Sequence, residues 1–88
     1  MLRISRVEVA RERVHLRLDG QISGRWVVLL RRICDSAAKN GARIVLDVRN
    51  ISFADREGIV LLRALEERGA EILDMPAFIA EQIKRETP

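Results

Sequence analysis

Aromatic side chains are scarce in this sequence, at 3% of its 88 residues. There is no tyrosine, and the aromatic set is Trp26, Phe53 and Phe78. Proteins that bind single-stranded nucleic acids usually stack bases on several aromatic rings. The scarcity therefore argues against that class of protein, and it predicts a core built from aliphatic side chains.

Cysteine and histidine each occur once, as Cys34 and His15. A single cysteine cannot form an internal disulfide, which is typical of a reducing compartment, so we expect a cytoplasmic protein. No cluster has the spacing of metal ligands, and no metal site is expected. Cys34 is predicted to be a small core residue, and His15 an exposed residue at a sheet edge.

Long apolar runs and common cofactor motifs are also missing. No stretch approaches the roughly 20 apolar residues that a membrane-spanning helix needs. Arg3 and Arg6 interrupt the apolar start, so no signal peptide is predicted. There is no Walker loop, GxGxxG or GxSxG motif, and we expect no cofactor. Asp47 and Asp55 flank a predicted loop without a further acid or base, so the sequence predicts a protein that is not an enzyme.

Charge is distributed unevenly along the chain. The net charge is +3, with +6 in residues 1–50 and −3 in residues 51–88. Most arginines of the basic half are spread over several predicted elements, among them Arg3, Arg6, Arg11, Arg13, Arg17, Arg25, Arg31 and Arg32. Without aromatic residues among them, this pattern favours a solvated surface, and a basic nucleic-acid-binding domain remains the weaker alternative.

The apolar pattern of the first half predicts two strands and a helix. Residues 2–9 form a strand in which the apolar set shifts from Leu2 and Ile4 to Val7 and Val9, and this change of face indicates a bulge. Residues 13–19 alternate as a second strand, which Gly20 is expected to end in a turn. Residues 25–39 form an amphipathic helix that ends at Asn40 and Gly41. Its inward residues are predicted from the helical spacing: Trp26, Leu29, Leu30, Ile33 and Ala37.

In the second half, residues 44–48 are almost continuously apolar and predict a central strand buried on both faces. A loop over residues 49–54 leads to a helix from the N-cap Asp55 to about Arg68. A short strand over residues 70–73 precedes a last helix, which is expected to direct Phe78, Ile79 and Ile83 inward and to fray over residues 86–88. The crossovers predict one α/β domain over residues 1–88, a single-layer, mixed, mostly parallel sheet of four to five strands with about three helices, two of which share one face. The strand order is left open.

The segment over residues 44–62 resembles the central motif of STAS domains, the modules of anti-sigma factor antagonists and sulfate transporters. The family has a buried strand with a Leu-Asp-hydrophobic step, an aromatic residue in the next loop, and Asp-Ser-Ser/Thr-Gly at the start of a helix. Here these read Leu46-Asp47-Val48, Phe53 and Asp55-Arg56-Glu57-Gly58. Residues 18–22, Leu-Asp-Gly-Gln-Ile, are similar to an upstream family step, so the resemblance covers most of the chain.

The resemblance implies a bacterial-type regulatory function through protein contacts. In the family, an anti-sigma kinase phosphorylates the serine after the motif aspartate, and the phosphate blocks binding. Arg56 takes that position here, so the usual phospho-switch is not expected, and Ser52 is a weak substitute site. The resemblance implies a partner-binding surface around the start of the helix, over Ser52, Asp55, Arg56, Glu57, Gly58, Val60 and Arg63.

Other interpretations remain open for this surface. Asp55, Arg56 and Glu57 fit equally well as an N-cap followed by two solvated first-turn residues. The protein partner is expected to be an anti-sigma-type regulator. The alternative is a component of a membrane transporter, with this chain as a cytoplasmic STAS subunit of a lipid-type ABC system. The oligomeric state is not predicted.

Overall fold

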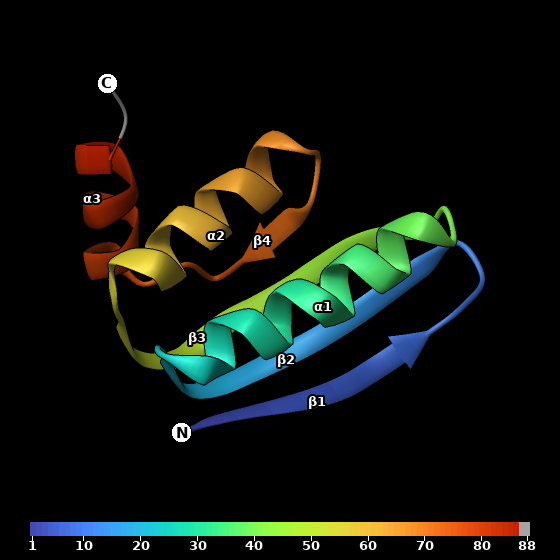
Figure 1. The fold of residues 1–88 in the computed structure, drawn as a ribbon, viewed down its shortest axis with the longest axis horizontal. Helices are drawn as coiled ribbons and strands as arrows, with labels where there is room; N and C mark the ends of the chain where they lie inside the picture. The colour runs from blue at the N-terminus through green and yellow to red at the C-terminus, as the bar shows by residue number, and fades with distance from the viewer. Residues whose placement is uncertain (87–88) are drawn as a thin grey trace.

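The computed structural model describes residues 1–86, except for the side chain of Val9. Along the chain lie β1 (Leu2–Val9), β2 (Arg13–Ile22), α1 (Arg25–Lys39), β3 (Arg43–Ala54), α2 (Arg56–Glu67), β4 (Glu71–Leu73) and α3 (Ala77–Glu86) (Figure 1). Glu86 is the last residue of α3, and the fraying predicted for residues 87–88 lies outside the described residues. No helix in residues 1–86 is long and apolar enough to cross a bilayer.

The four strands form one sheet in the order β1-β2-β3-β4. β1 pairs antiparallel with β2, whereas β2–β3 and β3–β4 are parallel. The pairing register of β1 shifts between Arg6 and Glu8, which confirms the predicted bulge and places it at Val7. The predicted mixed, mostly parallel sheet with a central third strand is therefore confirmed.

Two sequence predictions at the ends of the strands are wrong. β2 continues through Gly20 to Ile22, and β3 continues through the expected loop to Ala54, because these two extensions pair with each other. Gly20 has a φ of 108° inside the strand. A Cβ there would collide with the carbonyl of Met1, which accepts a 2.9 Å hydrogen bond from the N–H of Gln21. The glycine thus allows a close backbone approach and does not form a turn.

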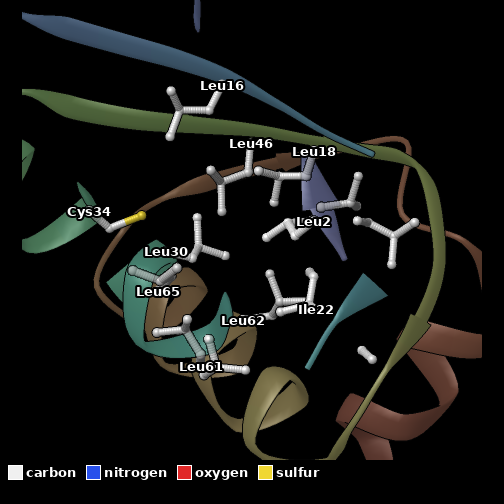
Figure 2. Packing of buried hydrophobic residues seen from close by; sticks show 14 of the residues in the cluster. Leu2, Leu16, Leu18, Ile22, Leu30, Cys34, Leu46, Leu61, Leu62 and Leu65 are labelled. Atoms are coloured by element: carbon white, nitrogen blue, oxygen red, sulfur yellow. The ribbon is translucent and has the colours of Figure 1, made fainter. Parts of the chain in front are cut away.

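The aliphatic core lies between one face of the sheet and helices α1 and α2 (Figure 2). Leu16, Leu18 and Leu46 project from the central strands into this cluster. The helices contribute buried residues that include Val27, Leu30, Cys34, Leu61, Leu62 and Leu65. The predicted placement of Cys34 in the core is confirmed.

The buried face of α1 is rotated from the predicted one. Val27 lies at helical spacing from Leu30 and Cys34 and is buried with them, although it was not in the predicted inward set. Leu29 is 41% exposed, while Trp26, Ile33 and Ala37 pack only partly against the core. In α3, Ile79 is buried and Ile83 packs partly against the core, as predicted, but Phe78 is exposed, which contradicts its predicted inward position.

The opposite face of the sheet carries mainly polar side chains, with exposed Arg3, Arg13, Arg17 and Arg43. His15 lies on this face between its partners Glu8 and Val45. Because β1 and β3 flank β2 on both sides, His15 is in an interior strand and half-buried, which corrects its predicted edge position. Its Nε2 atom is buried and has no hydrogen-bond partner among the described residues.

Candidate functional site

The carboxylate of Asp55 fixes the turn between β3 and α2. Its Oδ1 accepts a 2.8 Å hydrogen bond from the N–H of Gly58, which satisfies a free donor in the first turn of α2. Its Oδ2 accepts a 3.0 Å bond from the N–H of Gly24, the N-cap of α1. The predicted N-cap is confirmed, and the same side chain also joins the starts of both helices.

Gly58 allows the first turn of α2 to lie directly against β2. A Cβ at this position would lie 2.5 Å from the carbonyl oxygen of Ile22 and 3.0 Å from the Cγ2 of Ile22. The N–H of Asp55 donates to the same Ile22 carbonyl at 3.1 Å. Gly58 is buried, so its role within the predicted surface is to support the turn and not to contact a partner.

Three residues of the predicted surface are exposed on α2. The Arg56 side chain is 80% exposed, and its Nε lies 3.7 Å from Oε2 of Glu86 on α3. Glu57 is exposed in the first turn, where the helix dipole favours its negative charge. Val60 follows one turn later and is 42% exposed. The start of α2 therefore presents a cation, an anion and an apolar side chain together.

Arg63 is held within the fold. Its Nη1 donates a 2.8 Å hydrogen bond to the backbone carbonyl of Glu86, and its Nε lies 2.9 Å from Oε1 of Glu67. A helix leaves its last carbonyls without internal partners, and Arg63 satisfies one of them at the end of α3. The residue consequently links α2 to α3, which stands beside it in Figure 1.

The end of β3 completes the surface with Ser52 and Phe53, both exposed. The Ser52 hydroxyl donates a 3.2 Å hydrogen bond to the carbonyl of Gly20, which supports a structural role for this serine. Phe53 is 49% exposed and pairs with Gln21 in the sheet. Phe53 belongs to the family motif but not to the predicted binding surface, because an aromatic residue beside a buried strand gives no sign of its exposure in the sequence.

The site holds no assembled catalytic group within residues 1–86. Asp47 accepts a 3.0 Å hydrogen bond from the N–H of Arg49 and lies 3.5 Å from the Arg49 guanidinium, so it stabilises the strand locally. Asp55 is occupied by its two backbone donors. No group of three histidine, cysteine or acidic residues that could hold a metal ion occurs among the described residues.

The thiol of Cys34 lies apart from this surface. Burial, and secondly the negative charge of Asp35, raise its pKa from 9.0 to about 11. Figure 2 shows the sulfur directed into the core. Because thiolate is the reactive form, such a cysteine is inert near neutral pH.

Comparisons with known proteins bear on the fold. The sequence matches no protein-family model and no curated protein. The structure is similar to that of the anti-sigma factor antagonist SpoIIAA in its unphosphorylated form, with a TM-score of 0.71 and 23% identity over 94% of this chain and 79% of that chain. It is also similar to an uncharacterised DUF3478-family protein with a SpoIIAA-like fold from Shewanella loihica PV-4, with a TM-score of 0.58 and 8% identity over 88% and 69% of the two chains. The predicted STAS-like fold is thereby confirmed.

Proposed function

From the STAS-like fold of this chain, we propose that it is a non-catalytic regulatory module that binds another protein at the start of α2. We call this surface the α2 docking surface, and it comprises Ser52, Asp55, Arg56, Glu57, Gly58, Val60 and Arg63, with Phe53 beside them. The observation that carries the proposal is the double role of Asp55, which fixes the turn by hydrogen bonds to Gly24 and Gly58 while Arg56, Glu57 and Val60 stay exposed.

A fixed turn favours binding for an energetic reason. Association must overcome the entropy of ordering the groups at the interface, and a surface that is already ordered loses less. Arginine is enriched among the residues that dominate binding energy, and phenylalanine is enriched in the cores of protein interfaces, so Arg56 and Phe53 are suitable contact residues. Asp55 and Gly58 act in this proposal as supports, and Arg56, Val60 and Phe53 as contacts.

The same surface is proposed to work without a serine phospho-switch at its usual position. Arg56 is the first residue of α2 and has no hydroxyl group. The Ser52 hydroxyl is engaged with the Gly20 carbonyl, which makes it a weak substitute for a phosphorylation site. The module is therefore expected to bind its partner constitutively, with the amount of protein setting the response.

The partner is proposed to be a protein of the anti-sigma regulator type, and a membrane transporter component is the alternative. A pull-down with tagged protein from detergent-solubilised lysate of the source organism distinguishes them by the identity of the captured protein. Arg56→Glu reverses the charge at the centre of the surface and should reduce capture and affinity at least about tenfold.

Arg11→Glu provides the matched control for that experiment. Arg11 is exposed in the turn between β1 and β2, at the opposite end of the sheet from the start of α2. Capture that is lost with Arg56→Glu and kept with Arg11→Glu supports the α2 docking surface. Equal capture by all three proteins contradicts it, and a nucleic acid recovered in place of a protein would favour the basic-domain alternative.

A further inference from the structure

A second surface lies on the other side of α1, where the helix faces the edge strand β1. A groove with a cavity of about 340 Å³ runs between them. Its floor is apolar and is formed by Val14, Ile33 and Ala37. None of the residues that form the α2 docking surface lines it.

Two arginines from distant parts of the chain meet at this groove. Arg6 reaches it from β1 and Arg32 from α1, with Ser36 and Asn40 at the same site. Neither arginine forms an ion pair with a described side chain, and no acidic residue lines the groove. By contrast, the arginines of α2 and its C-cap are all paired, Arg56 with Glu86, Arg63 with Glu67 and Arg68 with Asp35. The groove therefore lacks its complementary negative charge.

The apolar character extends along α1 towards its N-terminus. Leu29 precedes Ile33 by one helical turn and is exposed, and Trp26 lies a further turn back and is only partly buried. The guanidinium of Arg25 lies 5.1 Å from the centre of the Trp26 ring. An apolar strip flanked by cations thus continues beyond the groove.

The free side of β1 narrows the kind of ligand that fits. β1 is the first strand of the sheet, and no described strand pairs with its other edge, so its backbone N–H and C=O groups face outward there. Figure 1 shows β1 at the border of the molecule, with α1 packed on the neighbouring strands. An extended peptide can add to such an edge and place alternate side chains into the groove, whereas a flat bilayer cannot enter it.

We propose that the groove between α1 and β1 binds an extended acidic peptide segment of a protein partner, with aliphatic side chains on the apolar floor and carboxylates beside Arg6 and Arg32. The site is independent of the α2 docking surface. A chain with both sites could hold one partner at each.

The test uses a fluorescein-labelled peptide of repeating Val-Ser-Glu-Ser units, in which valine and glutamate lie on the same face of an extended strand, and the same peptide with lysine in place of glutamate. Fluorescence anisotropy should show saturable binding of the acidic peptide only, weakening with added salt. Amide NMR shifts should change in β1 and around Ile33 and leave the start of α2 unchanged. The doubly substituted Arg6→Glu/Arg32→Glu protein should bind at least about tenfold more weakly.

The matched control is Arg11→Glu/Arg31→Glu, which makes the same charge change at two exposed, unpaired arginines outside the groove and should bind as wild type. Thermal melts verify that both variants fold. No saturable binding, equal loss in both variants, or shifts at α2 would overturn the proposal. Arginine-dependent binding to phosphatidylglycerol vesicles without peptide binding, or dimers that bury β1, would overturn it as well. Arg56→Glu should not change peptide binding, so this result and that for the α2 docking surface can fail separately.

Discussion

The carboxylate of Asp55 accepts the N–H of Gly24 at 3.0 Å across a sequence separation of 31 residues. This bond joins the starts of α1 and α2. At the other end of the same helices, Arg68 lies 3.5 Å from Asp35. The two helices are therefore tied at both ends: at one end the Asp55 carboxylate accepts a backbone N–H from the start of each helix, and at the other end there is an exposed ion pair.

The two ties should differ in strength. Asp55→Ala removes two hydrogen bonds to backbone donors and should lower the free energy of unfolding by about 2 kcal/mol, since a lost N-cap alone costs about 1. Asp55→Asn keeps one acceptor oxygen and should lose about half as much. Asp35→Ala removes only the exposed ion pair and should cost less than about 1 kcal/mol. Urea denaturation of the three variants measures the order, and equal losses for Asp55 and Asp35 would contradict it.

Gly58→Ala should destabilise the fold, although alanine is the better helix former. At an unobstructed helical site the change would stabilise by about 1 kcal/mol. Here the new Cβ would lie 2.5 Å from the backbone oxygen of Ile22, so α2 must move away from β2, and a net loss of about 1–3 kcal/mol is expected. Urea denaturation checks the sign, and a more stable variant would show that the two elements can separate freely.

Arg63→Ala should loosen α3 from α2. The variant loses the 2.8 Å bond to the carbonyl of Glu86 and the contact with Glu67, and about 1 kcal/mol of local stability is expected to be lost. Hydrogen exchange in α3 should become several-fold faster. The control is Arg85→Ala, which removes an exposed pair within α3 and should leave exchange almost unchanged. Identical hydrogen-exchange rates of α3 in the two variants would show that Arg63 does not hold α3 against α2.

The stability of the folded protein is expected to depend on pH through Cys34. Its pKa is raised to about 11 in the folded protein, so the folded state holds the thiol proton more tightly than the unfolded state. The corresponding stability is present below the unfolded pKa of 9.0 and is lost as the pH rises through about 11. Thermal melts at about pH 8 and about pH 11 should show a larger loss for wild type than for Cys34→Ala. Parallel losses in the two proteins would mean that the thiol is not the group responsible.

Local signals made the helices of this fold predictable. Asp55 marks the start of α2 and Gly69 lies directly after its C-cap, because capping chemistry depends only on neighbouring residues. The extensions of β2 and β3 were missed for the opposite reason. Asn50 and Ser52 resemble loop residues, and only their pairing with the segment around Gly20 makes them a strand.

The two proposed binding surfaces also differ in how much of them could be predicted from the sequence. The start of α2 could be located from its motif, whereas the exposure of Phe53 and the links from Arg63 to α3 depend on tertiary packing. The groove beside β1 could not be found from the sequence, since Arg6 and Arg32 are far apart until the fold brings them together. Two arginines that are distant in the sequence thus line one groove in the folded protein.

The strand order also has a consequence for how the chain folds. Only β1 and β2 form a local hairpin, while β2–β3 and β3–β4 each require an intervening helix to be in place. Closing those longer loops costs chain entropy before the hydrogen bonds of the parallel strand pairs form to offset it, and this slows folding. The hairpin and α1 are therefore expected to form early, and β4 to join last. During that interval the edge of β3 is unprotected, so β3 is the segment through which nascent chains would associate.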